Sequence, residues 1–342
     1  MISETTDRPL VSIYCLTYNH EKYIRDCLDG LLMQKTDFPF EIIVHDDAST
    51  DGTQSIIREY ETAHPQVIHT ICQKENQRQK KVPMVKNFIF PKVRGKYVAI
   101  CEGDDYWTDA AKLQTQVELL EKHPECHFCV CGVEEVSANK TPLGVFHPAE
   151  EIPQEIIEPE KFIELAGKYA FHTSSYLMRY DDWAPYVLDS PPFYRVSDIG
   201  DLPMLLYFGS LGSVGNVNRV MSCYRRGAPD SYSNRKNNWQ EQNKIRHFKC
   251  QCASWREFDL WSSRRFHEVC AKKVSRNMFG LCVLSCSARD FLTSENREYY
   301  RKLPVPKRLY ILLAAAFPRL MKWHYTVTMK RREEKELALW AR

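Results

Sequence analysis

Residues 97–107 read Tyr97-Val98-Ala99-Ile100-Cys101-Glu102-Gly103-Asp104-Asp105-Tyr106-Trp107. The first five of these residues are uncharged and mostly apolar, which predicts a strand covered on both faces. Three carboxylates, Glu102, Asp104 and Asp105, then follow within four residues, and a helix is predicted from Thr108-Asp109 onward. Like charges this close repel one another, whereas Mg²⁺ and Mn²⁺ take oxygen ligands. A divalent cation therefore explains the three acids better than the alternative, a polar turn with a capping aspartate.

Composition indicates a globular protein of one large domain or two ordinary ones, with 342 residues, 44% hydrophobic and 27% charged. The net charge of +3 is uneven, because residues 307–342 carry +6 and the preceding 306 residues carry −3. No basic stripe is present in the body of the chain, so we expect no nucleic-acid partner.

The 13 cysteines are odd in number and scattered through predicted strands and helices, and residues 1–9 do not resemble a signal peptide. We therefore expect reduced thiols in a cytoplasmic protein. Cys126, Cys129 and Cys131, with His127, fall in a predicted strand at 126–133. No second cysteine pair follows at matching spacing, so a structural zinc ion is not favoured.

Strands and helices alternate in the first third of the chain. Strands are predicted at 10–17, 40–44 and 67–72, an amphipathic helix at 24–32 and a short helix at 84–90. This alternation is typical of an α/β unit with a mostly parallel sheet. Ligands of such sheets bind at the carboxyl ends of the strands, where Thr17-Tyr18-Asn19, Asp46-Asp47 and the three acids all fall. We expect them to line one pocket.

The turn after the first strand, residues 17–21, contains no glycine, so neither a dinucleotide fingerprint nor a P-loop is present. A diphosphate would then need a metal bridge, which the acids offer. Asp46 and Asp47 would suit hydrogen bonds to a base or ribose. A capped loop explains Ser49 and Asp51, but it leaves Asp46 and Asp47 unexplained.

Three segments together carry a resemblance: residues 11–19, Asp46-Asp47-Ala48-Ser49-Thr50-Asp51-Gly52-Thr53, and Glu102-Gly103-Asp104-Asp105. In this order and spacing they resemble the signatures of family 2 glycosyltransferases of the bacterial polysaccharide type, strongly over 9–135 and weakly over 170–235. The resemblance implies the α/β GT-A fold, a Rossmann-like mixed sheet flanked by helices, with a helical C-terminal extension. It also implies inverting transfer of a sugar from a nucleotide diphosphate donor (we expect a UDP-sugar) to an acceptor hydroxyl, with Mn²⁺ or Mg²⁺ as cofactor.

The same resemblance assigns site residues. Thr17 and Tyr18 would flank the nucleobase, Asp47 would hold base or ribose, Glu102 would touch ribose, and Asp104 would bind the metal beside Asp105. The expected donor site contains Thr17, Tyr18, Asn19, Asp46, Asp47, Asn87, Glu102 and Arg225, and the expected metal ligands are Asp104 and Asp105. Lys86 stands where the family often has arginine.

The second half of the chain is expected to bind the acceptor. Residues 142–159 suggest a surface connection, and 171–179 a strand that resembles the family's acceptor segment. Asp201 occupies the place of the family's catalytic base, with Asp198 as fallback; helix N-cap is the competing role for Asp201. Gly227 stands where the family has a histidine, so Arg225 or Arg226 would neutralise the phosphate charge, and 227–238 suggests a lid.

The C-terminal residues read as helical over 239–300, with aromatic residues that favour packing over sugar binding. Residues 309–317 are apolar but too few to span a bilayer, and basic residues flank them. They predict an interfacial segment on the inner face of the cell membrane, or else a helix docked on the body. The expected domains are 1–235 (donor half 9–135, acceptor half 136–235), a helical extension at 236–306 and a basic amphipathic tail at 307–342.

Two other functions fit parts of the pattern. A metal-dependent sugar-phosphate nucleotidyltransferase shares acids at strand ends, but it would show a glycine-rich phosphate loop. The second is a non-catalytic subunit of a membrane assembly that binds a sugar nucleotide. The intact acids at the strand ends argue against it. The expected acceptor is a glycan or lipid-linked molecule of surface polysaccharide synthesis.

Overall fold

The computed structural model describes residues 8–168, 170–227, 240–285, 288–321, 323–324 and 327. The chain divides into two compact units. The first contains residues 1–191 and 204–237, and the second contains 192–203 and 238–342.

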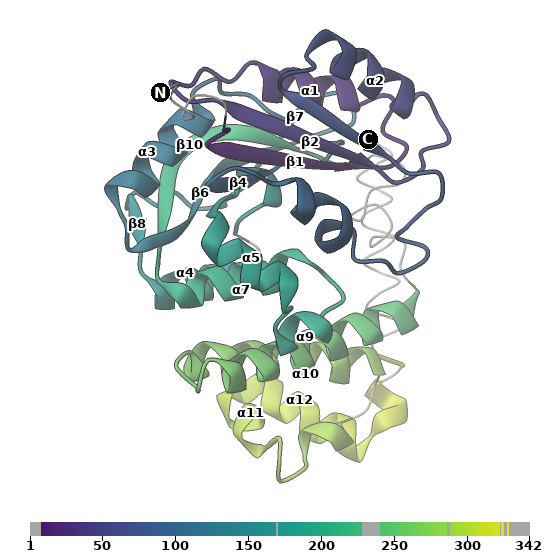
Figure 1. Cartoon of the computed structure of the whole chain (residues 1–342). Helices are drawn as coiled ribbons and strands as arrows, with labels where there is room; N and C mark the ends of the chain where they lie inside the picture. Colours follow the sequence, from purple (N-terminus) through teal and green to yellow (C-terminus); the bar gives the residue numbers. More distant parts are fainter. Residues whose placement is uncertain are drawn as a thin grey trace. The chain divides into compact units, whose positions relative to one another are not determined.

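A mixed sheet forms the centre of the first unit, with the strand order β3-β2-β1-β4-β9-β6-β10-β5 (Figure 1). The parallel strands are β1 (Val11–Thr17), β2 (Phe40–Asp46), β3 (Ile68–Cys72) and β4 (Tyr97–Ile100). Beyond them lie β5 (Tyr106–Trp107), β6 (Cys126–Val136), β9 (Leu177–Arg179) and β10 (Ser213–Arg225). Because β9 runs antiparallel to both β4 and β6, the sheet is mixed, as predicted.

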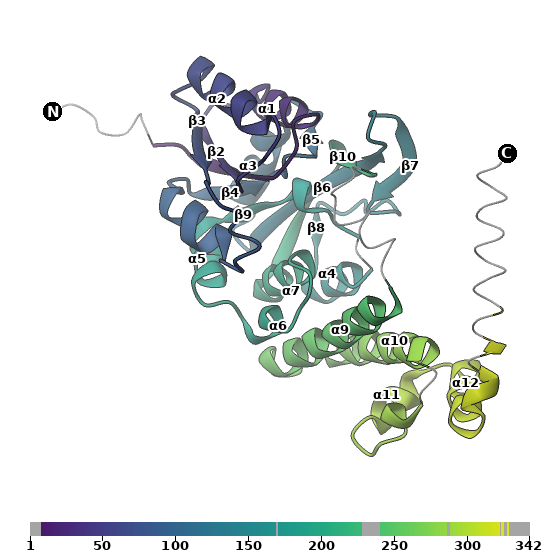
Figure 2. The same cartoon turned by 90° about the vertical axis from the view of Figure 1, so that its right-hand side faces the viewer.

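Helices cover both faces of this sheet (Figure 2). On one face α1 (Ile24–Leu32), α2 (Thr53–Ala63) and α3 (Lys112–Lys122) pack against alternate strand residues such as Ile13 and Cys15. On the other face Tyr14 joins a second core with α4 (Pro159–Ala166), α5 (Tyr180–Leu188) and part of α7 (Asp201–Leu211). The alternation along β1 follows from the two-residue period of a strand.

Two segments differ from the sequence predictions. The expected surface connection at 142–159 contains β7 (Pro142–His147), paired with β6, and β8 (Ile156–Ile157), paired with β10. The expected strand at 171–179 is a 3₁₀ turn, η3 (Thr173–Ser175), followed by the short β9. Side-chain bonds tie this turn down, since Trp107 Nε1 donates to the carbonyl of Ser174 at 2.9 Å and Gln116 Nε2 to that of Ser175 at 2.8 Å. The predicted short helix at 84–90 is present as η1 (Val85–Ile89) and η2 (Phe90–Lys92).

The second unit is helical, as predicted for 239–300. It contains α6 (Pro192–Arg195), α9 (Glu241–Trp261), α10 (His267–Ser285), η4 (Arg289–Phe291), α11 (Arg297–Lys302) and α12 (Val305–Ala316). Its aromatic residues pack on one another: Phe258 lies 5.3 Å from Phe193 and 5.5 Å from Phe266 between ring centroids. Within the described residues, no helix is both long and apolar enough to cross a membrane.

Candidate active site

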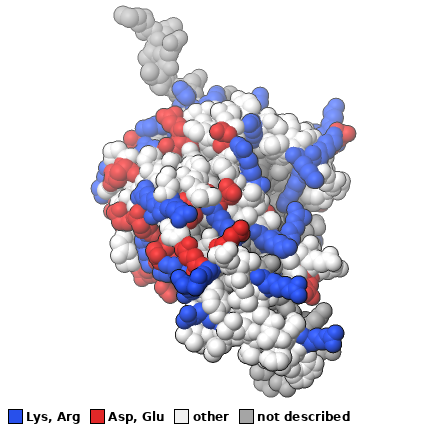
Figure 3. All heavy atoms as spheres, turned by 90° about the horizontal axis from the view of Figure 1, so that it is seen from below, with Lys and Arg blue, Asp and Glu red and all other residues white. Residues whose placement is uncertain are grey.

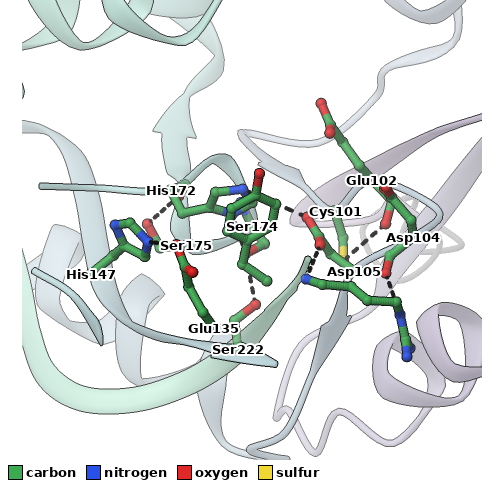
Figure 4. A network of polar contacts seen from close by, with 12 residues as sticks. Cys101, Glu102, Asp104, Asp105, Glu135, His147, His172, Ser174, Ser175 and Ser222 are labelled. Atoms are coloured by element: carbon green, nitrogen blue, oxygen red, sulfur yellow. Dashed lines mark hydrogen bonds and ion pairs between the residues drawn. The ribbon is translucent and has the colours of Figure 1, made fainter. Parts of the chain in front are cut away.

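The three acids predicted to bind a metal lie together just beyond the end of β4. Ligand atoms of Glu102, Asp104 and Asp105 all fall within 4.8 Å of one another (Figure 4). Glu102 is exposed, whereas Asp104 and Asp105 are largely buried. Their convergence has a local cause, because the chain turns at Gly103 and donates Gly103 N–H to the carbonyl of Leu16 at 3.0 Å.

Asp105 has the most strongly perturbed environment of the three. Its Oδ1 accepts a hydrogen bond from Arg225 N–H at 2.9 Å, whereas its buried Oδ2 has no hydrogen-bond partner among the described residues. Burial raises the pKa of this carboxyl well above its usual range, and the neighbouring Asp104 and Glu102 raise it further. A cation would relieve both effects. The oxygen ligands and the orphaned Oδ2 therefore fit Mg²⁺ or Mn²⁺.

Two histidines that the sequence analysis did not assign stand beside these acids. His20 Nε2 lies 3.9 Å from Asp104 Oδ2, and His172 Nε2 lies 3.8 Å from Asp105 Oδ2. His172 Nδ1 accepts from Ser174 N–H at 3.3 Å, which leaves Nε2–H facing Asp105. Burial lowers the pKa of His172 to about 3, with His147 and Arg226 adding to the effect. The sequence signals were the adjacency of His20 to the predicted Asn19 and the place of His172 in the 171–179 segment.

Arg225, predicted to neutralise phosphate charge, is buried behind the acids. Its Nε donates to the carbonyl of Asp104 at 2.9 Å, and its Nη2 donates to Asp26 at 2.8 Å. The guanidinium also lies over the rings of Tyr23 and Tyr106, at 4.8 and 5.2 Å from their centroids. With 1% of its surface exposed, Arg225 fixes the backbone of the acidic segment. Its predicted phosphate contact stays a prediction.

The turn after β1 is built from residues of the predicted donor site. Asn19 adopts a positive φ of 55°, accepts Thr50 N–H on Oδ1 at 2.8 Å and donates its own N–H to Ser49 Oγ at 2.8 Å. Thr17 Oγ1 is buried without a hydrogen-bond partner among the described residues. A Cβ added at Gly103 would lie 2.7 Å from Thr17 Oγ1, so the acidic segment passes directly over this turn.

Asp46 and Asp47 accept hydrogen bonds from groups that the sequence analysis did not identify. Asp46 Oδ1 accepts from Ser49 N–H at 2.9 Å and from Gln54 Nε2 at 2.6 Å. Asp47 accepts from the backbone N–H groups of Gln77 at 2.6 Å and Arg78 at 3.1 Å. Both carboxylates therefore organise loops around the strand ends, and their predicted contacts with base or ribose stay predictions.

The remaining predicted residues are more dispersed. Tyr18 is half-buried, and Asn87 is exposed on η1, where its N–H bonds the carbonyl of Pro83. Lys86 donates to the carbonyl of Leu188 at 2.7 Å. Most of the predicted lid at 227–238 lies outside the described residues, because residues 228–238 are not described.

The candidate base Asp201 is the first residue of α7 and belongs to the second unit. Asp198, the second candidate for the base, lies in the same unit. Its carboxylate oxygen Oδ2 is 2.7 Å from His247 Nδ1. Glu102, Asp104 and Asp105 belong to the first unit, whereas Asp201 belongs to the second. The role of Asp201 as catalytic base therefore stays a prediction.

A mixed sheet flanked by helices, with an acidic cluster at its strand ends, is the arrangement of GT-A glycosyltransferase folds. TarS residues 1–349 of S. aureus, solved in complex with UDP-GlcNAc, superpose with a TM-score of 0.56 over 95% of this chain and 92% of that one. Their sequence identity is 14%, so the likeness shows the fold.

Sequence comparison defines the family. Residues 12–178 match the model of Glycosyl transferase family 2. An uncharacterized protein of Mycobacterium tuberculosis is 33% identical over 241 residues, covering 67% of this chain and 64% of that protein. TuaG of Bacillus subtilis, named for teichuronic acid biosynthesis, is 33% identical over 147 residues, covering 43% of this chain and 56% of that protein. Residues 12–178, just under half of this chain, form a glycosyl transferase family 2 domain, as the sequence motifs indicated.

Proposed function

We propose that this protein is an inverting, metal-dependent glycosyltransferase that moves a sugar from a UDP-sugar to an acceptor hydroxyl. The observation that carries the proposal is the clustering of Glu102, Asp104 and Asp105 at the end of β4, with Asp105 Oδ2 lacking a hydrogen-bond partner within the described residues. The family match of residues 12–178 supports it. A bound Mn²⁺ or Mg²⁺ would neutralise charge on the departing diphosphate.

In this proposal the chain's own residues position the donor. Asp104 and Asp105 hold the cation, and Glu102 accepts hydrogen bonds from the ribose. Thr17, Tyr18 and Asn19 contact the nucleotide across the turn after β1, with Asp46, Asp47 and Asn87 at its edge. Asp201 acts as general base and takes the acceptor's hydroxyl proton as the new bond forms at the anomeric carbon, with inversion.

We further propose that the acceptor belongs to a surface polysaccharide or a lipid-linked glycan, and that the enzyme works in the cytoplasm, peripherally on the inner face of the cell membrane. The name of the relative TuaG supports a role in polysaccharide synthesis, because teichuronic acid is a glycan. The UDP-GlcNAc bound to TarS supports a UDP-sugar as donor.

A donor screen tests the proposal. Purified full-length protein is incubated with a panel of nucleotide sugars and Mn²⁺ or Mg²⁺, and release of nucleoside diphosphate is measured. We expect release with one donor class, and loss of release in excess EDTA. Release of pyrophosphate from a sugar phosphate and a nucleoside triphosphate would instead identify a nucleotidyltransferase. Donor binding without any turnover, with acceptor extracts present, would identify a non-catalytic subunit.

A further inference from the structure

Helix α12 in the second unit presents an apolar face to solvent. Its inward side is buried, with Ile311 and Ala314 in the interior and Tyr310 packed 5.5 Å from Phe279 of α10. The outward side, and the helical turn that follows, expose seven large apolar side chains that we call the α12 face: Val305, Leu309, Leu312, Leu313, Phe317, Leu320 and Trp323. Within α12 they recur at the spacing of one helical face.

These side chains are more exposed than a stable fold requires. Each exposes between 46% and 64% of its surface, and Trp323 has the largest exposed fraction. Single exposed apolar residues are ordinary, but a run of them along one helix marks a surface that is covered in use.

The sequence that flanks the α12 face is basic over residues 303–332, and three glutamates follow at 333, 334 and 336. Between Leu303 and Arg332 the sequence has seven Lys or Arg residues and no Asp or Glu. Of these, Lys307, Arg308 and Arg319 are placed and solvent-accessible. Figure 3 shows uncharged surface at the lower end of the view, with Lys and Arg side chains and some acidic side chains at its margin.

Apolar residues beside Lys307, Arg308 and Arg319 match an anionic bilayer surface, in which acyl chains meet phosphate headgroups. A protein partner would more commonly be met by charges of both signs. The 12 residues of α12 extend about 18 Å along the helix axis, against roughly 30 Å of hydrocarbon. The helix is therefore suited to lie in the interface plane.

We propose that the α12 face binds anionic phospholipid, with its apolar side chains in the headgroup–acyl boundary and its basic residues on the phosphates. This goes beyond the proposed transfer reaction and names the surface that would make the contact. Binding is measured without donor or acceptor, so its failure is distinct from a failure of the proposed activity.

Vesicle co-sedimentation of the full-length protein tests the proposal. We expect binding to vesicles containing about 30% phosphatidylglycerol to be about tenfold tighter than to pure phosphatidylcholine, and to weaken with added salt. The double variant Leu309→Glu/Leu313→Glu should lose about tenfold in binding to the anionic vesicles. The matched control Leu260→Glu changes a leucine of α9 that is 61% exposed, and it should bind like wild type.

A second readout does not depend on the double variant being folded. Trp323 fluorescence should shift to the blue on anionic vesicles and be quenched by brominated lipid, and Trp323→Phe should remove that change. Equal binding to both vesicle types, equal loss in Leu260→Glu, or an unchanged signal in Trp323→Phe would overturn the proposal. So would a lipid-free oligomer that Leu309→Glu/Leu313→Glu dissociates, because the face would then bind a second copy.

Discussion

Arg225 Nε donates to the carbonyl oxygen of Asp104 at 2.9 Å, while Arg225 N–H donates to the Asp105 carboxylate at the same distance. The end of β10 thus holds two consecutive acids that follow β4. Through these two hydrogen bonds Arg225 positions the candidate metal ligands Asp104 and Asp105.

Arg225→Lys should weaken both folding and metal binding. Lysine cannot reproduce the planar guanidinium contacts, and Asp26 loses its buried partner, so we expect the free energy of unfolding to fall by roughly 3 kcal/mol. Mn²⁺ affinity, measured by titration, should fall about tenfold or more because the ligands lose their support. Arg219→Lys, at a half-exposed arginine of β10, is the control. An increase in donor KM alone, with unfolding unchanged, would favour the phosphate contact predicted from the sequence.

Asp104→Ala should nearly abolish transfer while the protein stays folded. A unit charge pair at 4 Å with an effective dielectric near 20 is worth about 4 kcal/mol, so we expect donor-dependent diphosphate release to fall about a thousandfold. Asp37→Ala, which removes an exposed carboxylate elsewhere in the same unit, is the matched control. Near wild-type turnover in Asp104→Ala would contradict the metal assignment.

Asp47→Ala should loosen the loop at 73–82 even without a donor. The carboxylate holds the backbone of Gln77 and Arg78, and charged hydrogen bonds of this kind stabilise local structure. Trypsin should therefore cut after Arg78 about tenfold faster, as followed by mass spectrometry of the fragments. Glu75→Ala, which removes an exposed carboxylate of the same loop, should leave this rate nearly unchanged. Unchanged cutting in Asp47→Ala would mean that the contact with Gln77 and Arg78 does not hold the loop.

Asp201→Ser separates the two roles considered for this residue. Serine keeps a short oxygen-bearing side chain in the first turn of α7, so helix stability should change little, but it cannot act as a carboxylate base. We expect turnover to fall by about 10²–10⁴ with the melting temperature nearly unchanged. Retained turnover in Asp201→Ser, together with loss in Asp198→Asn, would move the role to Asp198.

His267 should make the second unit more stable at mildly acidic pH. It bonds Asp259 at 2.8 Å and Glu298 at 2.6 Å, and the hydrogen bond to Asp259 is the main cause of its raised pKa. Since the pKa is higher in the folded state, the stabilisation is complete below about pH 6 and disappears as pH rises through the raised value.

Chemical denaturation of His267→Gln checks this dependence. The variant's loss of unfolding free energy should be larger at about pH 5.5 than at about pH 8.5. His64→Gln, at an exposed histidine of the first unit, is the control. An equal loss at both pH values would contradict the assignment.

The sequence predicted the strand ends and the acids because both signals are local. Mostly apolar runs define β1 and β2, and the three carboxylates fall within four consecutive positions. The partners of those residues are not local: Arg225 is 120 positions from Asp105, and Asp47 binds backbone N–H groups 30 and 31 positions away. A backbone N–H donor cannot be recognised from the residue types in a sequence. The sequence analysis therefore assigned Asp47 and Asp105 only to ligands.

The segment at 171–179 shows a different limit. Its residues have strand character, but the carbonyls of Ser174 and Ser175 are captured by Trp107 and Gln116, which favours a turn. The extra strands β7 and β8 formed where prolines and acids suggested only a connection, because β6 and β10 offered unpaired edges. Tertiary pairing decided both cases.

The tie between Arg225 and the acidic segment also bears on how the protein matures. A growing chain that has emerged only to β6 already contains every acid of the candidate metal site, yet it lacks the strand that fixes their backbone. A fragment limited to the donor half should therefore fold its first strands and still bind cations poorly, and competence would be acquired late in synthesis, once β10 closes the sheet.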